Sequence, residues 1–355
     1  MRLRRLIPLL FPVLLQLLSA VPQLDAADTL VLEPKVDARG HIVLISGDEE
    51  YRSEEVMPML AKILSQHHGY RCTVLFAFGP DGADYIDSNN QQGLRGVETL
   101  DSADLMIIAT RFRQPDEQQA EHIAAWLRAG KPIIGLRTAT HAFRGGQKFT
   151  DDVNYDQFGR LILGEQWVSH HGRHKVEGAR SVVEEAAVNH PILRGVGDIF
   201  APSDVYGVRN LTDKDTVLLR GAITESLDPE SPNLTDDDRN KPMQALAWVH
   251  QWQVEGGKPG TSFCTTAGAA VDFVDEDLRR LIVNASMFLL GHEVPQQAEV
   301  SFVDPFYPTF YGFINDKNYY SSRRIVPEDF ALGRTPYRAD PPGSPEWPYR
   351  PQPQR

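Results

Sequence analysis

Three histidines within five residues, His170, His171 and His174, form the densest group of metal-binding residue types in this sequence. His170 and His174 are four residues apart, so on a helix both imidazoles would lie on one face and could bind zinc or another divalent transition metal. Gly172 favours a loop, in which chelation would need a different geometry. The alternative is a polar loop whose histidines hydrogen-bond to the backbone or to a ligand.

The segment from Pro132 to His141 has the pattern of a nucleophile elbow, in which a buried strand, a tight turn and a helix expose one side chain. The tip position holds Arg137 rather than cysteine, serine or aspartate. The pattern therefore indicates the scaffold of a hydrolytic site without its usual nucleophile. His141 follows four residues later, where a neutral imidazole could move a proton, donate to a ligand or bind a metal. A structural hydrogen bond at the helix start is the alternative for His141.

Asp48 lies in a polar loop, residues 47–52, directly after an apolar run. A carboxylate there could exchange protons with a substrate or bind sugar hydroxyls. Glu54 and Glu55 follow in the first turn of a helix that we expect to be capped by Ser53, where acids complement the helix dipole. We interpret both glutamates as solvated helix-start residues and keep Asp48 as the candidate for chemistry.

Arg111 and Arg113 follow another apolar run and join Arg137 as candidates to orient a substrate. Guanidinium groups bind carboxylates, phosphates and sugar hydroxyls, but salt bridges with the acids of the loop 48–50 are the alternative. Thr266 lies in a loop of small residues where the backbone could approach a ligand, or where a helix and a strand could pack closely. The ring of Tyr206 could stack on a sugar or fill the core.

Apolar runs and amphipathic segments must position these residues. The runs that predict strands are residues 41–46, 72–76, 105–109, 133–134 and 261–265, and helical patterns begin at 53, 115 and 275. Strands that are apolar throughout, with helices between them, are typical of a parallel sheet covered on both faces. Ligands bind beyond the carboxyl ends of such strands. Most of the candidate residues come directly after a predicted strand, so we expect them at this edge of the sheet. Residues 150–245 are less regular, and we expect short strands and loops there.

The two ends of the chain differ from this pattern. Residues 1–26 combine a basic start, a short apolar run and a cleavage-site pattern of small residues, which is typical of a signal peptide. An uncleaved membrane anchor is the alternative. We therefore expect a periplasmic or secreted protein that is free of the membrane after cleavage. Residues 296–326 are rich in aromatics and are expected to pack on the domain. Residues 327–355 are rich in proline and are expected to be extended or disordered.

The net charge and the cysteine content indicate which classes of binding partner and which crosslinks to expect. A formal net charge of −12 disfavours binding to nucleic acid or anionic lipid, because both are negatively charged. A small neutral molecule is therefore the expected partner. Cys72 and Cys264 lie in apolar runs and are expected to be buried thiols, although an oxidising compartment would permit their pairing. The sequence is compatible with a homo-oligomer.

Taken together, these features resemble the ThuA-like (trehalose utilisation) family, a branch of the class I glutamine amidotransferase-like superfamily. The resemblance runs from His41 to about Val294 and rests on Gly47-Asp48, the elbow from Gly135 to Phe143, His170-His171-Gly172, Asp204-Val205-Tyr206 and the strand and turn from Trp248 to Gly268. It implies a flavodoxin-like three-layer α/β fold with a parallel sheet over residues 38–295. It also implies a role in processing a disaccharide or keto-sugar.

The chain departs from the amidotransferases at two points. Arg137 replaces the cysteine of their Gly-x-Cys-x-Gly elbow, and the distal histidine and glutamate of their triad have no counterpart, so we expect no glutamine hydrolysis. The resemblance implies a hydrolase, lyase or isomerase in which Arg137 and Arg111 orient a sugar, Asp48 or His141 moves protons, and the histidine cluster binds a metal or the sugar. The alternative is a non-catalytic carbohydrate-binding or scaffold protein on the same fold.

Overall fold

The computed structural model describes residues 28–347 and 349–352, and the predicted signal peptide, residues 1–26, lies outside the described residues. The strands of the central sheet are, in chain order, β1 (Thr29–Leu32), β2 (His41–Gly47), β3 (Arg71–Leu75), β4 (Leu105–Thr110), β5 (Ile133–Leu136), β7 (Ala179–Val183), β8 (Phe200–Ala201), β10 (Asp215–Ile223), β11 (Gln244–Trp252) and β12 (Gly260–Thr265). A second, small sheet pairs β6 (His170–His171) with β9 (Val205–Tyr206). None of the helices in the described part of the chain has both the length and the apolar character needed to cross a bilayer.

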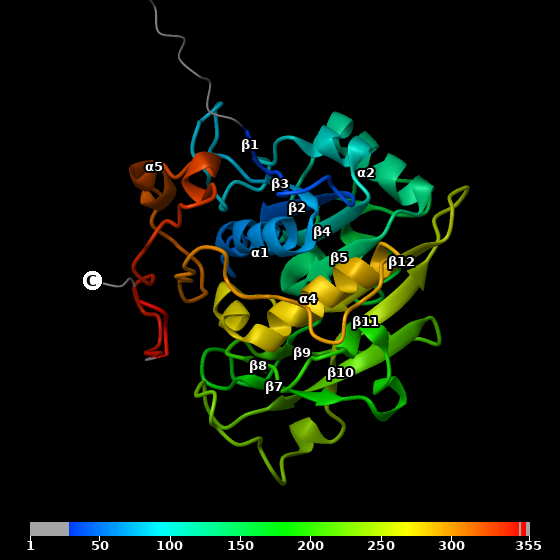
Figure 1. Ribbon diagram of the computed structural model, residues 1–355, viewed down its shortest axis with the longest axis vertical. Coiled ribbons are helices and arrows are strands. Elements are labelled where there is room, and N and C mark those ends of the chain that lie inside the picture. Colours follow the sequence, from blue (N-terminus) through cyan, green and yellow to red (C-terminus); the bar gives the residue numbers. More distant parts are fainter. Residues whose placement is uncertain (1–27, 348, 353–355) are drawn as a thin grey trace, which may run out of the picture.

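Five strands at the centre of the sheet pair in parallel, in the spatial order β3-β2-β4-β5-β12 (Figure 1). Numbered along the chain, this is the order 2-1-3-4-5 of flavodoxin-like folds. All seven residues of β2 are buried, because helices cover both of its faces. The prediction of a flavodoxin-like α/β fold is confirmed.

The sheet is larger and more mixed than the purely parallel one predicted. Beyond β12, the strands β11, β10, β7 and β8 continue it in antiparallel pairs, and β1 is antiparallel to β3 at the other edge. Between Ala179 and Trp252, which the structure describes throughout, only short 3-10 turns separate the strands. Strands without a crossover helix between them pair antiparallel, which explains the difference.

Helices cover the parallel strands on both faces. The helices α1 (Ser53–His68) and α4 (Glu276–Leu289) pack on one face, and α2 (Glu117–Ala129) and the short α3 (Phe158–Ile162) pack on the other (Figure 1). Helix α2 begins at a capping box formed by Asp116 and Gln119 and ends at Gly130 in the left-handed conformation, where the sequence predicts its end.

The start of α1 differs from the prediction in two ways. The residue that caps the helix is Arg52, which has a left-handed backbone with φ of 62°, and the Ser53 hydroxyl instead accepts a hydrogen bond from the Asp48 amide. Glu54 and Glu55 are buried, with 1% and 8% of their surface exposed, so the interpretation of solvated glutamates is wrong. The physical reason is that the C-terminal part of the chain covers them and supplies Arg338, whose Nη2 lies 2.9 Å from Oε1 of Glu55.

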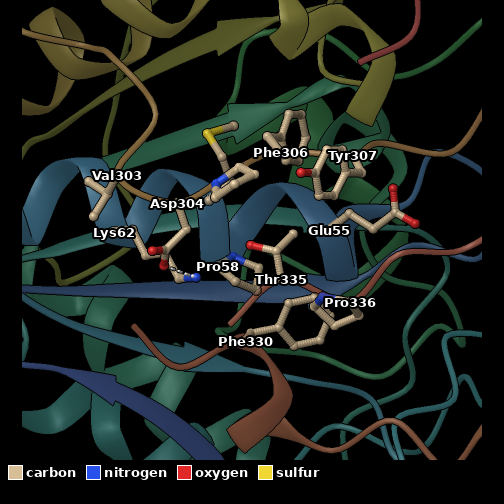
Figure 2. A pocket seen from close by; sticks show the side chains of 12 residues that line it. Glu55, Pro58, Lys62, Val303, Asp304, Phe306, Tyr307, Phe330, Thr335 and Pro336 are labelled. Carbon is tan, nitrogen blue, oxygen red and sulfur yellow. Dashed lines mark ion pairs between the residues drawn. The ribbon is translucent and has the colours of Figure 1, made fainter. Parts of the chain in front are cut away.

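The C-terminal extension packs along α1 and has little regular structure apart from α5 (Tyr319–Arg323) and the 3-10 helix η8 (Pro327–Phe330). Figure 2 shows one of its contacts with the helix, a cavity of about 30 Å³, which is room for about one water molecule. Lys62 from α1 points at Asp304 there, with Nζ 2.6 Å from the carboxylate. The proline-rich end is expected to be extended or disordered, but Arg338 and Arg350 are buried, and Arg350 donates to the carbonyls of Pro308 and Arg338.

The two cysteines lie in β3 and β12 and are buried, free thiols. These strands are the two edges of the parallel core, with three strands between them, so Cys72 and Cys264 are about four strand spacings, roughly 19 Å, apart. A disulfide needs Cα atoms within about 7 Å, so the fold forbids this pairing.

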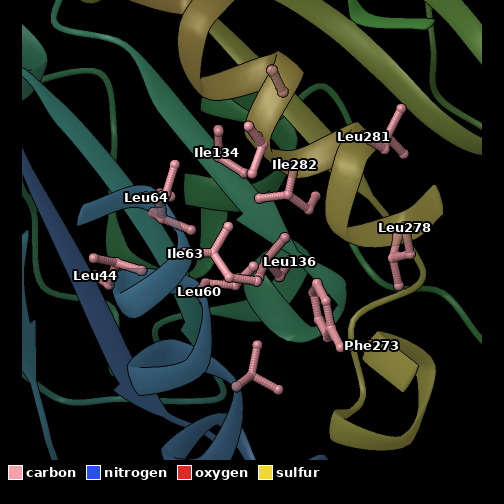
Figure 3. Close-up of a cluster of buried hydrophobic side chains, with 14 of the residues drawn as sticks. Leu44, Leu60, Ile63, Leu64, Ile134, Leu136, Phe273, Leu278, Leu281 and Ile282 are labelled. Carbon is pink, nitrogen blue, oxygen red and sulfur yellow. The ribbon is translucent and has the colours of Figure 1, made fainter. Parts of the chain in front are cut away.

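The largest apolar core lies between the sheet and the pair α1 and α4. Figure 3 shows Leu60 and Ile63 from α1 and Ile282 from α4 pointing toward Leu136 of β5. Because Leu136 is the last residue of β5, this packing fixes the position at which the strand ends. The elbow residue Arg137 follows immediately, so the core sets where the candidate site begins.

Candidate functional site

Most of the candidate residues lie at the carboxyl ends of neighbouring parallel strands. The loop 48–52 follows β2, Arg111 and Arg113 follow β4, and the 3-10 helix η2 (Arg137–His141) follows β5. The small sheet of β6 and β9 adds His170 and Tyr206 as a directly paired couple. Because β2 and β4 flank the point at which the strand order reverses, the site has the location expected for a ligand in this class of fold.

Arg137 has the strained backbone of an elbow tip, with φ of 41°, but its side chain points inward and is only 1% exposed. The guanidinium donates to the carbonyls of Asp204 and Thr266 and pairs with Oδ1 of Asp204 at 2.5 Å. It also lies between the rings of Tyr51 and Tyr206, 4.2 and 4.3 Å from their centroids. Protein groups surround the guanidinium, and the substrate-orienting role of Arg137 stays a prediction.

The same interactions involve Tyr206 and Thr266. Tyr206 is 2% exposed and its face is covered by Arg137, so it packs as a core aromatic. Thr266 is buried, its carbonyl accepts from Arg137, and its hydroxyl has no hydrogen-bond partner. Both residues are buried, and the substrate-contact roles expected of them stay predictions.

Asp48 organises the loop after β2. Its Oδ1 accepts hydrogen bonds from the amides of Glu50 and Tyr51 at 2.7 and 3.1 Å, and its Oδ2 accepts one from the Thr138 hydroxyl at 2.8 Å. Burial, followed by the nearby charge of Glu49, raises the pKa of Asp48 to about 7. Asp48 is 1% exposed and ties the loop to the elbow, and its catalytic role stays a prediction.

We predict that Asp48→Asn stabilises the protein increasingly as the pH rises from about 4 to 7. The folded-state pKa of Asp48 is raised from 3.8 to about 7, so the wild type loses the stability conferred by the protonated form over that interval, by up to about 1.4 kcal/mol per pH unit. The asparagine keeps the two amide contacts through its oxygen and can donate to Thr138. Urea denaturation at pH 4.5, 6 and 7.5 measures the difference, with the exposed Asp151→Asn as control. A difference that does not change with pH would contradict the prediction.

Arg111 and Arg113 share one carboxylate. Nη1 of Arg111 lies 2.5 Å from Oε1 of Glu49, and Nη2 of Arg113 lies 2.6 Å from Oε2. The Arg113 side chain is fully buried and also donates to the carbonyls of Ser88 and Asn90, and its role in substrate binding stays a prediction. The salt-bridge alternative therefore describes both arginines, while Arg111 remains partly exposed and within reach of a ligand.

His141 lies under an aromatic cover. Its ring centroid is 5.0 Å from that of Phe112 and 5.3 Å from that of Trp167, and it is 9% exposed. Burial, followed by the positive charges of Arg111 and Arg137, lowers the pKa of His141 well below its ordinary value. The imidazole is therefore neutral at pH 7, the form that accepts a proton or binds a metal.

His170 and His174 meet on Asp204. His170 Nδ1 lies 2.7 Å from Oδ2 of Asp204, and His174 Nδ1 lies 3.4 Å from Oδ1. The three residues can each offer one ligand atom within 4.8 Å of the others. Neither His170 Nδ1 nor Asp204 Oδ2 has a hydrogen-bond partner, because the two atoms are close but not aligned as donor and acceptor. Although burial alone would raise the pKa of Asp204, His170, His174 and Arg137 lower it, so the carboxylate is charged.

His171 does not belong to this group. Successive residues of a strand point to opposite faces, and in β6 the Nε2 of His171 lies 2.7 Å from the carbonyl of Arg239. His171 thus lies outside the group of possible ligands, which consists of His170, His174 and Asp204. Sequence reasoning missed Asp204 as a ligand, although Asp204-Val205-Tyr206 was recognised as a motif, because the pairing of β6 with β9 is what brings it to His170.

Glu50 lies between His174 and Arg111. Its Oε1 is 3.6 Å from His174 Nε2, and its Oε2 is 3.7 Å from Arg111 Nε. The cavity of Figure 2 lies elsewhere, against α1 and the extension, and its Lys62 is already paired with Asp304. His170, His174 and Arg111 are partly exposed, and Glu50 is buried between them; these four residues are therefore the candidate site.

The fold and the site define a flavodoxin-like α/β protein whose elbow carries a buried arginine in place of a nucleophile. A family model described as ThuA, trehalose utilisation, matches residues 42–289, and the chain belongs to this family. No curated protein matches it. The solved structures similar to it include a putative ThuA-like protein from Bacteroides uniformis (12% identity, 71% of this chain, 92% of that chain, TM-score 0.44) and another from Parabacteroides merdae (12%, 78%, 97%, TM-score 0.46).

Proposed function

We propose that this protein is a carbohydrate-processing enzyme that acts on a disaccharide or keto-sugar with the help of a divalent transition metal such as zinc. The observation that carries the proposal is the convergence of His170, His174 and the charged Asp204, with two of their facing atoms left without hydrogen bonds. Two imidazoles and a carboxylate suit such a metal. The family name supports a sugar as the substrate.

The residues around the group have distinct roles in this proposal. A bound metal would polarise a sugar carbonyl or hydroxyl. His141, which is neutral and in ring contact with Trp167, accepts a proton from a sugar hydroxyl. Arg111, which is partly exposed, binds a second hydroxyl, and the buried Glu50 orients Arg111 and His174. Arg137 orients Asp204 through its ion pair, so it acts as a positioning residue.

We also propose that the protein is exported to the periplasm or beyond, on the basis of the sequence pattern of residues 1–26. The net charge of −12 supports a small-molecule sugar rather than a nucleic acid as the partner.

One observation favours a second function, a non-catalytic carbohydrate-binding protein. The elbow tip is turned inward and Asp48 is buried, so two of the groups expected to perform catalysis are each only 1% exposed. Such a protein would bind sugars and release them unchanged.

Metal content and turnover should fall together in the ligand variants. We expect about one transition metal ion per purified wild-type chain. In His170→Ala and His174→Ala the metal content per chain should be at least about tenfold lower, because each variant loses a ligand. His171→Ala is the matched control and should retain the metal, since His171 faces Arg239. Elemental analysis measures the metal, and a screen of disaccharides and 3-keto-glycosides measures product.

The possible outcomes separate the two functions. Product formed by the wild type and lost in His170→Ala and His141→Ala supports the metal-assisted enzyme. Sugar binding without product from any substrate supports the binding protein. A folded wild type that contains no metal after purification and after incubation with zinc would overturn the metal-assisted mechanism.

A further inference from the structure

A short segment outside the family-matched residues lies directly on the candidate site. The Gly312 amide donates to the Glu50 carbonyl at 2.8 Å, and Nη2 of Arg52 donates to the Gly312 carbonyl at 2.5 Å. Gly312 has φ of 143°, a backbone conformation that residues with a side chain rarely adopt, so this position favours glycine. The backbone of the extension is therefore fixed to the loop that carries Glu50.

The residue before Gly312 faces inward. Tyr311 is 1% exposed, its ring centroid lies 5.2 Å from those of both Tyr51 and His174, and its hydroxyl donates to the Pro202 carbonyl. Tyr311 thus braces the imidazole of a proposed metal ligand. The extension is in this way part of the site and not a separate appendage.

The residue after Gly312 faces outward. Phe313 is 50% exposed, which is unusual for a phenylalanine held by a fixed backbone. The guanidinium of Arg111 lies 4.8 Å from its ring centroid and 4.6 Å from that of Phe112 on the other side. Since Arg111 is itself held by Glu49, the exposed ring has a defined position at the border of the site.

The aromatic contacts continue from Phe112 to a second exposed ring. Phe112 contacts His141, His141 contacts Trp167, and Trp167 contacts His170 at 5.9 Å between centroids. Trp167 is 36% exposed. Phe313 and Trp167 are therefore both exposed, and the four contacts through Arg111, Phe112 and His141 separate the two rings.

We propose that Phe313 is the stacking face for one ring of a disaccharide whose other ring lies over the candidate site, and that the C-terminal extension thereby contributes to substrate specificity. The C–H faces of a pyranose pack on aromatic rings, while its hydroxyls hydrogen-bond to charged groups such as the partly exposed Arg111. This inference rests on the proposed function, since it assumes that the site binds a sugar.

The test is calorimetric titration of the metal-loaded full chain with trehalose, cellobiose and methyl glucoside. Phe313→Ala should raise the dissociation constant of the bound disaccharide about threefold to tenfold, the worth of one aromatic contact, and change that of methyl glucoside less than twofold. Tyr337→Ala is the matched control, because Tyr337 is 48% exposed on the same extension but contacts Tyr307 and Arg350. Melting temperature and metal content confirm that the variants are folded.

The outcomes are distinguishable. If the wild type binds a disaccharide and Phe313→Ala binds it equally well, or Tyr337→Ala loses as much affinity, the role of the extension is overturned while the proposed function stands. If the wild type binds none of the three sugars at millimolar concentration, the sugar-binding function is overturned, and the inference with it.

Discussion

Replacing Arg137 with methionine is expected to lower the free energy of unfolding by about 3–5 kcal/mol, the cost of removing one partner of a buried ion pair. Its Nη2 pairs with Asp204, both side chains are 1% exposed, and methionine would leave the carboxylate buried beside two unpaired carbonyls. The rings of Tyr51 and Tyr206 would also lose the cation between them. Urea denaturation at pH 7 measures the change.

Arg111→Met is the matched control for this prediction. Arg111 also pairs with a glutamate and lies between two aromatic rings, but 20% of its side chain is exposed, so we expect a loss of only about 1 kcal/mol. Arg137→Lys keeps the charge without the geometry for several acceptors and should lie between the two. A loss of less than about 1 kcal/mol in Arg137→Met would show that the tip arginine does not hold the site together.

The parallel core could be predicted from the sequence because its strands are buried on both faces. The segment from Ile42 to Ile45 has no polar residue, and such a run has few structural solutions other than a central strand. The elbow was equally visible, because a β-strand followed by a strained turn leaves a local pattern, and φ of 41° at Arg137 agrees with it. Local sequence therefore predicted where the backbone places each candidate.

The direction of each side chain could not be predicted in the same way. Arg137 turns inward because Tyr51, Ser203 and Asp204, all distant in sequence, form its receptor. The spacing of His170 and His174 indicated chelation, but a strand of two residues is too short to leave a periodicity, so the opposite direction of His171 was invisible. Long-range pairing decides these orientations, and a single sequence does not show it.

Glu55 illustrates the same limit at the helix start. Glutamates in a first turn are usually solvated, and the residues that bury this one come from the extension: the Thr309 amide and hydroxyl donate to its carboxylate, and Arg338 pairs with it. The proline-rich composition of residues 327–355 gave no sign that two of their arginines would be buried. The first turn of α1 and the C-terminal extension each have a common sequence pattern, and only the folded protein shows that they contact each other.

This coupling leads to the second large prediction, that Arg338→Met destabilises the protein by about 3–5 kcal/mol at pH 8 and by less at pH 5. Burial already raises the pKa of Glu55, and Arg338 acts against that rise. Without Arg338 the folded-state pKa rises further, so protonation on lowering the pH through that value removes the unpaired charge and restores part of the stability. Urea denaturation at both pH values measures the loss.

Two further variants assign the effect to the buried carboxylate. Adding Glu55→Gln to Arg338→Met should recover stability at pH 8, because the amide keeps the Thr309 contacts without a charge. Arg334→Met, at an exposed arginine of the same segment, should change stability by less than about 0.5 kcal/mol. If Arg338→Met is equally destabilised at pH 5 and pH 8, and Glu55→Gln restores nothing, the extension is held to α1 by packing and not by charge. The extension that carries Phe313 would then depend on apolar contacts such as those of Phe306 and Phe330 with the main core, and its attachment would be independent of pH.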